Sequence, residues 1–361
     1  MTLVSSIANT LKQLQDKPVL YPLIKEVVGC NAPKTLVVRN QNEMLDVATG
    51  QFGGTLCFFG SGILLDRLLK PFYQKILTHP NLLPNPKAAL EWTRLGKSFS
   101  IYSLQAALYW AVPFFRNFLT SRRSGTHNFI QMIGVQRKAD LVNQQKLKEK
   151  QAYSLGMVRK IIIGGVIASA LSVAASVFAI RKGLAINKTA AFLLKHLGLG
   201  GGSFKNYPRW AEFFFIAVAS YVGWIHATRD KFELKEQMLQ FGSFLFGWFV
   251  PPLAFERYYK GRLRQLLNNK PLFEKVIGVN ASMLNINHIR QHLASRPLLK
   301  RQAEALFVSQ TLFSLGTSIV LLSVLPQLCN IYLTQRRVAR AKSRLIPPAV
   351  LPPSPQLYAS H

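Results

Sequence analysis

Few side chains in this sequence have the types and spacing that catalysis or metal binding requires. His288 and His292 lie four residues apart, so on a helix they would share one face and could bind a metal ion together. The glutamate that zinc proteases place beside the first histidine is missing, and the neighbouring residues are basic. We therefore interpret this pair as polar surface, and we predict no metal site and assign no catalytic residues.

The glycine-rich run at 198–203 resembles a phosphate-binding loop only in its composition. It lacks the Gly-Lys-Ser/Thr ending that contacts the phosphates, and no strand pattern precedes it. A flexible link between two apolar stretches explains the run better. We predict no bound cofactor.

Polar residues at the ends of two apolar stretches are of more functional interest. Gln51 and Gln240 each begin such a stretch, and Asp66 and Glu256 each end one, followed directly by an arginine. The simpler interpretation places each acid and its arginine at the level of the lipid headgroups. If the helices are short or broken, these groups would lie deeper and could gate or bind an ion. Gln51, Asp66, Gln240 and Glu256 are therefore the candidate transport or gating residues.

A third pattern predicts packing and no chemistry. Gly164, Ala168, Ser172 and Ser176 recur every four residues, which gives one helix face of small side chains. Small residues let a second helix approach closely, and this is how membrane helices associate. We expect a helix–helix contact along this face, either within the chain or between copies in a homo-oligomer.

These residues lie in or beside long stretches without charged side chains. Asp, Glu, Lys and Arg make up only 17% of the 361 residues, whereas about 25% is usual for a soluble domain. Charged residues are absent from 47–65, 98–115, 161–180, 213–228, 237–255 and 305–335. A helix needs about 20 apolar residues to cross a bilayer core of roughly 30 Å. Apolar residues run continuously here and do not alternate, so the pattern predicts an all-α integral membrane protein with about six hydrophobic helices, located in a membrane and multi-pass.

The six stretches differ in continuity. Four of them, 98–115, 161–180, 213–228 and 305–335, are predicted to be membrane-embedded helices. Glycines interrupt 47–65, and glycines with the pair Pro251-Pro252 interrupt 237–255. For these two we keep an alternative interpretation, a short interfacial or buried helix.

The charge balance indicates the surroundings of these helices. Lys and Arg number 45 against 15 Asp and Glu, a formal net charge of +30. Such an excess favours anionic partners, which are nucleic acid or lipid headgroups. Because the basic residues flank apolar stretches and no nucleic-acid-binding pattern accompanies them, we expect anionic phospholipids of a bilayer and no nucleic acid.

Two segments of the chain resemble each other. Gln-Phe-Gly opens both the 51–67 and the 240–257 segments, and Lys-Pro follows each, at Lys70 and Lys270. Pro113 and Pro326 each precede Asn, Thr and a pair of arginines at similar spacing. Two predicted helices separate the copies, so both would enter the membrane in the same direction. The pattern predicts a parallel internal repeat, with chance similarity among aromatic apolar segments as the alternative.

The same patterns divide the chain into segments. Residues 1–46 form an N-terminal segment, in which Val4, Ile7, Leu11 and Leu14 predict an amphipathic helix that rests on the membrane or packs on the protein. The remaining segments are a first helical unit (47–123), a basic helical loop (124–160), a central helix pair (161–228), a second helical unit (237–337) and a basic, then proline-rich tail (338–361).

Three classes of function fit these features. A non-enzymatic membrane protein that organises the membrane or binds partners is favoured, because a catalytic set is missing and a packing face is present. A transporter or channel with its site between the 51–67 and 240–257 segments is the first alternative. A membrane-embedded lipid-modifying enzyme is the second. An ordered central cavity lined by Gln51, Gln240, Asp66 and Glu256 would favour transport, whereas a dry, fully packed interior would favour the first class.

Overall fold

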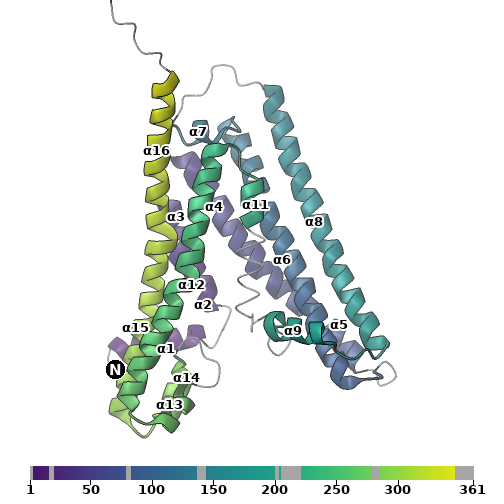
Figure 1. Cartoon of the computed structure of the whole chain (residues 1–361), viewed down its shortest axis with the longest axis vertical. Coiled ribbons are helices and arrows are strands. Elements are labelled where there is room, and N and C mark those ends of the chain that lie inside the picture. The colour runs from purple at the N-terminus through teal and green to yellow at the C-terminus, as the bar shows by residue number, and fades with distance from the viewer. Residues whose placement is uncertain are drawn as a thin grey trace, which may run out of the picture.

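The computed structural model describes residues 3–15, 20–78, 83–135, 144–199, 203–204, 221–277 and 284–345. Every regular element in these ranges is a helix. The longest helices form two arms, which we define as residues 39–124 (first arm) and 229–345 (second arm). Figure 1 shows that the arms meet at the upper end of the molecule and lie apart at the lower end.

Each arm begins with a long helix that descends from the upper end. In the first arm α4 (Gln41–Thr55), the π-helical turn η2 (Leu56–Gly60) and α5 (Ser61–Leu77) form one continuous helix. In the second arm α12 (Lys231–Leu267) descends in the same direction (Figure 1). Asn40 caps α4 and Asp230 caps α12, because their side chains accept hydrogen bonds from backbone N–H groups of the first turn.

Each arm is completed by a helix that returns to the upper end. In the first arm this is α6 (Pro86–Ser124), which ends at the left-handed Gly125. In the second arm α15 (Pro297–Thr317), the π-helical turn η7 (Ser318–Val324) and α16 (Leu325–Leu345) follow one another without a break.

Helix α8 (Gln144–Arg181) lies along α6 on the outer side of the first arm (Figure 1). The two helices approach closely at Gly165, where an added Cβ would overlap the side chain of Ala107. The short helix α9 (Lys188–Leu197) follows and packs on α6 as well.

Three short helices surround the lower end of the second arm. They are α1 (Leu3–Gln15), α13 (Lys270–Ile277) and α14 (Ile286–His292), and their apolar side chains form one core with the adjacent ends of α12 and α15. Ile7 and Leu11 of α1 lie against this core. Of the two places predicted for the N-terminal amphipathic helix, the structure shows the one on the protein.

The remaining short helices lie beside the second arm or near the upper end (Figure 1). Residues 20–36 form α2 (Leu20–Ile24), the π-helical turn η1 (Lys25–Asn31) and α3 (Ala32–Leu36). Turn η1 contacts η7, where Ser323 Oγ donates to the carbonyl oxygen of Cys30 at 2.7 Å. The short helices α7 (Phe129–Met132) and α11 (Tyr221–His226) complete the upper end.

Four helices are long and apolar enough to cross a membrane: Gln41–Leu77, Gln144–Arg181, Lys231–Leu267 and Pro297–Ala341. They contain the predicted stretches 47–65, 161–180, 237–255 and 305–335. The two stretches interrupted by glycine or proline therefore belong to long helices, and their alternative interpretation as short helices is wrong.

The other two predicted stretches stay predictions. Residues 98–115 are helical within α6, but this helix is not among the four, since polar residues such as Ser98, Ser100 and Gln105 are buried along it. Of residues 213–228, the part up to 220 lies outside the described residues. Among the described residues, four helices could therefore cross a membrane by length and apolarity, and six crossings remain a prediction.

Candidate functional site

The structure brings two of the four predicted transport residues together. Gln51 of α4 and Gln240 of α12 line one cavity of about 80 Å³ between the arms. Asp66 and Glu256 do not line it, and each has a local partner. Asp66 Oδ1 lies 2.6 Å from Lys97 Nζ, and Glu256 Oε1 lies 2.6 Å from Lys260 Nζ one turn along α12.

Above this cavity the arms are joined by charged side chains that the sequence analysis did not single out. We call them the charge network; none exposes more than 5% of its side chain. The network consists of Arg39, Glu43, Asp46, Arg116, Arg229, Glu233 and Glu236. Three arginines thus face four carboxylates in a buried interface, where an unpaired charge is strongly unfavourable.

The network is built on the same local arrangement at the start of each arm. The backbone N–H of Arg39 donates to Glu43 Oε2 at 2.6 Å, and that of Arg229 donates to Glu233 Oε2 at 2.7 Å. Each glutamate is therefore held in the first turn of its helix, where N–H groups are unpaired and the helix dipole favours negative charge. The local sequence alone can produce this part of the site.

Ion pairs between the arms require the tertiary structure. Arg39 Nη2 lies 2.5 Å from Glu236 Oε1, and Arg229 Nη2 lies 2.9 Å from Asp46 Oδ2. Each arginine thus contacts an acid of its own arm and an acid of the other arm.

Hydroxyl groups of the returning helices complete these pairs. Thr120 of α6 donates to Asp46 at 2.6 Å, and Thr334 of α16 donates to Glu236 at 2.5 Å. The acids of these two pairs, Asp46 and Glu236, therefore also receive a hydrogen bond from within their own arm.

The third arginine breaks this regularity. Arg116 of α6 lies 2.5 Å from Glu233, and its guanidinium stacks on the ring of Trp224 at 4.5 Å. The partner that the second arm offers to Glu43 is an amide, since Gln327 Nε2 donates to Glu43 Oε1 at 3.4 Å.

Helix α7 forms hydrogen bonds to the capping residues of both α4 and α12. Phe129 lies between the guanidiniums of Arg39 and Arg229, at 5.8 and 5.3 Å from its ring centre. Its backbone N–H donates to Asp230, and the amide of Asn40 donates to the carbonyl oxygen of Met132. Both capping residues are thus connected through one turn of helix.

His127 precedes this turn and is affected by the network. Burial, with the positive charge of Arg229 as the next cause, lowers the pKa of His127 to about 4. The imidazole is therefore neutral near pH 7.

The cavity lies below the charge network along both descending helices. Gln51 follows Glu43 by eight residues and Gln240 follows Glu233 by seven, which is roughly 10–12 Å of helix. Lys34 of α3 and Tyr109 of α6 contribute further polar groups. Glu26 and Cys30 of η1, Gln237 of α12 and aromatic side chains of α11 and α12 line the remainder.

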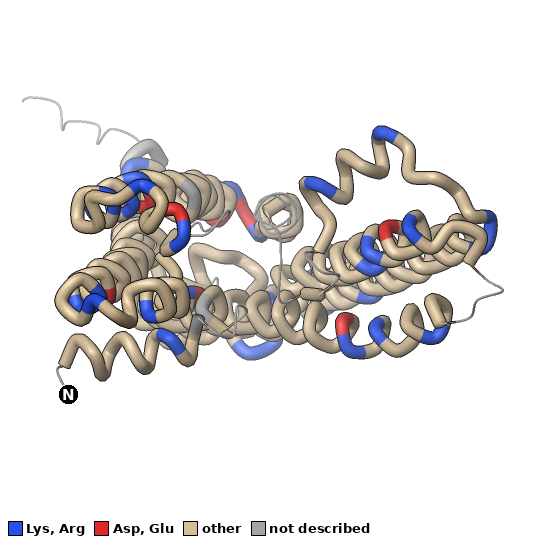
Figure 2. Tube along the Cα trace, turned by 90° about the horizontal axis from the view of Figure 1, so that it is seen from below, with Lys and Arg blue, Asp and Glu red and all other residues tan. Residues whose placement is uncertain are grey.

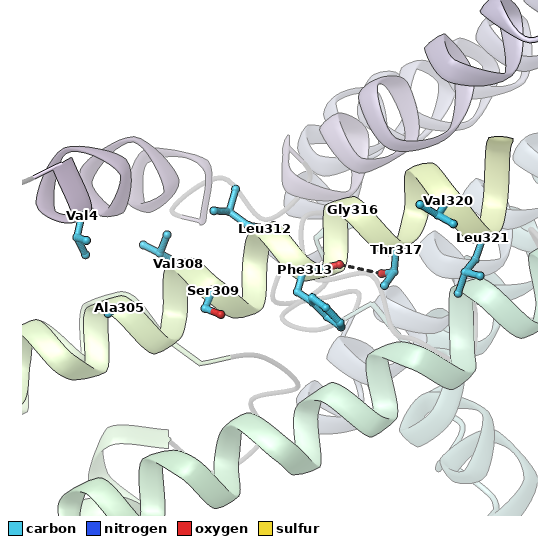
Figure 3. A pocket seen from close by; sticks show the side chains of 10 residues that line it. All are labelled: Val4, Ala305, Val308, Ser309, Leu312, Phe313, Gly316, Thr317, Val320 and Leu321. Atoms are coloured by element: carbon cyan, nitrogen blue, oxygen red, sulfur yellow. Dashed lines mark hydrogen bonds between the residues drawn. The ribbon is translucent and has the colours of Figure 1, made fainter. Parts of the chain in front are cut away.

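A larger hollow of about 780 Å³ has a different character. Figure 3 shows it along α15 and η7, with Val4 of α1 at one end. Its lining includes Leu312, Phe313 and Val320 and contains no ionisable side chain. We regard it as an apolar surface of the arm and assign no chemistry to it.

The remaining predicted residues lie away from the cavity. On α8 a Cβ added to Gly164 would meet nothing within 4 Å, whereas Gly165 and Ser169 face α6. Ser176 bonds to Tyr73 at 2.6 Å, and Ser172 bonds to its own backbone. The contact within the chain thus uses the face of Gly165 and Ser169, one residue away from Gly164 and Ala168. A contact of the face that carries Gly164 and Ala168 with another copy of the chain remains a prediction.

The histidine pair lies on α14, with ring centres 6.1 Å apart. Among the described residues no three potential metal ligands gather at one place. Figure 2, which views the molecule from below, shows Lys and Arg on both arms.

The described fold is all-helical, with four helices that could cross a membrane. The chain matches no known family model, no curated protein and no solved structure. One signal in the sequence could have located the network. Arginine, Asn or Asp, glutamate and a second acid recur at relative positions 0, 1, 4 and 7, starting at Arg39 and at Arg229, shortly before each Gln-Phe-Gly.

Proposed function

We propose that this chain is a multi-pass membrane transporter in which two duplicated helical units rock against each other. The charge network is the closed gate on one side, and the cavity between Gln51 and Gln240 is the substrate site. The observation that carries the proposal is the reciprocal pairing of Arg39 with Glu236 and of Arg229 with Asp46, directly above that cavity. This favours the transporter over the membrane-organising class that composition alone suggested.

The duplication has support from sequence and from position. The two helix starts share their spacing, and the matched residues make matched contacts. Both first helices descend from the same end (Figure 1), as a parallel repeat requires. Asp66 and Glu256 follow their glutamines by 15 and 16 residues, which puts both acids at a similar depth.

A buried ionic network suits a gate better than an apolar contact does. Desolvation largely offsets the attraction in buried ion pairs, so their net contribution to stability is small. Such a gate can exchange its protein partners for water when the arms separate. The polar partners also fix one register of closure, since any other leaves charges unpaired.

The test is a pair of distances across the proposed axis. Spin labels would replace Gln41 and Lys231, the exposed first residues of α4 and α12, in the full chain reconstituted in lipid with its native cysteines replaced by alanine. A second pair would replace Arg67 and Arg257 at the lower end. Pulsed electron spin resonance then reports both distances.

The variant that opens the gate is Asp46→Asn with Arg116→Gln and Glu236→Gln, since it removes one partner of every ion pair between the arms and keeps the glutamates that hold each helix start. Rocking predicts a longer upper distance and a shorter lower distance. A label pair within one arm, at Gln41 and Arg122, should not change. If the upper and lower distances also stay constant, the transporter proposal is wrong. The membrane-organising function favoured by the sequence is then the better interpretation.

A further inference from the structure

The geometry points to a small carboxylate as the occupant of the cavity, with Lys34 as its counter-charge. This names the substrate class of the proposed transporter and so rests on that function, although binding can be measured without transport. The evidence is a buried cation without a partner in a cavity of defined size.

Lys34 is only 7% exposed and lines the cavity. Its ammonium forms no ion pair and no hydrogen bond within the part of the chain that the structure describes. Buried charges in proteins are normally paired, so a bound anion would supply the missing interaction.

Neighbouring charges show that Lys34 is unusual here. Lys25, on the preceding turn, places its ammonium 4.2 Å from the ring centre of Trp248. Glu26 also lines the cavity and has an interaction of its own. Lys34 is thus a charged residue of the cavity lining that has no ion pair and no hydrogen bond to a described residue.

Other groups around the cavity distinguish a carboxylate from a simple inorganic ion. The hydroxyl of Tyr109 makes no hydrogen bond to a described residue and can donate one, as can the amide of Gln51. Trp224, Phe241 and Phe244 form apolar walls. Donors beside aromatic walls fit an anion that carries a short hydrocarbon chain.

The size of the cavity limits that chain. A protein cavity of about 150 Å³ accommodates benzene, so 80 Å³ leaves room for about three to five non-hydrogen atoms. Propionate, with five such atoms, is a suitable probe.

Binding would be measured on the purified full chain through its intrinsic tryptophan fluorescence, to which Trp224 contributes, and through the thermal unfolding midpoint. Propionate should quench saturably and raise the midpoint, whereas neutral propionamide at equal concentration should do neither. Sodium chloride keeps the ionic strength constant and tests simple anions. Equal effects of propionate and propionamide, or an effect of chloride alone, would overturn the assignment.

Lys34→Met removes the charge and keeps the length of the side chain. Removing one partner of a buried charge pair should weaken propionate binding by at least about thirty-fold. Without ligand, the variant should unfold at a higher temperature than the parent, because an unpaired buried charge is gone. Lys25→Met is the matched control and should retain propionate affinity; undiminished binding by Lys34→Met contradicts the inference.

Uptake of labelled propionate into proteoliposomes separates the two proposals. Saturable binding without uptake supports the anion site and counts against transport. Uptake that does not depend on Lys34 supports transport and counts against the site.

Discussion

The charge network has two halves, one around Glu43 and one around Glu233. They share the same local hydrogen bonds but differ in their ion pairs. Around Glu233, Arg229 lies 2.8 Å away and Arg116 lies 2.5 Å away. Around Glu43, the nearest guanidinium nitrogen is Nη1 of Arg39, 3.7 Å from Glu43 Oε1, and the second partner is the side-chain amide of Gln327.

The arginines differ in the same sense. Every guanidinium nitrogen of Arg229 donates to a carboxylate, whereas Nε and Nη1 of Arg39 have no hydrogen-bond acceptor among the described residues. The matched position explains the difference, since the residue three after Pro113 is Arg116, and the residue three after Pro326 is Cys329. The two helix starts therefore share their local geometry, while Glu233 has two arginine partners and Glu43 has one arginine and one amide.

The largest effect is expected from Glu233→Gln. It would leave Arg116 and Arg229 with Asp46 as their shared carboxylate in a buried site, and breaking such pairs costs about 3–5 kcal/mol. The thermal unfolding midpoint in detergent should fall sharply. Glu274→Gln, a change at an exposed position of α13, is the control and should have little effect. A midpoint like that of the parent would show that this half does not hold the arms together.

Gly50→Ala tests the same half through packing. A Cβ at Gly50 would lie 2.5 Å from the ring of Trp224, and so would displace the ring on which Arg116 stacks. Overpacking of this kind costs about 1–3 kcal/mol. The control is Gly53→Ala, three residues along α4, where the added Cβ meets Val112 at 3.8 Å. Equal destabilisation by both substitutions would contradict the view that Trp224 stabilises the Glu233 half by stacking on Arg116.

Glu43→Gln should have a small effect, within about 1 kcal/mol, if the halves differ as described. The substitution leaves three arginines facing three carboxylates and removes the most weakly paired one. Unfolding of this variant beside Glu233→Gln is the most direct comparison of the halves. A loss as large as that of Glu233→Gln would mean that the two sides are equally dependent on their charges.

The smallest effect on stability is expected at His127, whose pKa is affected by Arg229. Because its pKa is lowered to about 4 in the folded protein, against an ordinary value of 6.5, protonation favours the unfolded chain. This contribution to stability is present above pH 6.5 and is lost as the pH falls towards 4. The difference in unfolding midpoint between the parent and His127→Gln should therefore change over this range; a constant difference would contradict a neutral buried imidazole.

The sequence by itself determined the helical class and the positions of the long apolar helices. A span is a local property, because its length depends only on the number of consecutive apolar residues and the rise per residue. The stretches 47–65, 161–180, 237–255 and 305–335 could be located for this reason, whereas the repeat suggested by the Gln-Phe-Gly segments stays a prediction. The starts of α4 and α12 were equally local, since a cap and a glutamate three residues later act within one turn.

Only the tertiary structure decided what the charged residues at those starts do. Arg39 and Glu236 are separated by 197 positions, and their contact exists because two helices of different arms meet at one end. From the sequence these arginines could equally anchor helix ends at lipid headgroups, since composition gives the number of charges and not their partners. The same holds for Lys34, a basic residue of a short segment, which packing encloses beside two glutamines that lie 189 residues apart in the chain.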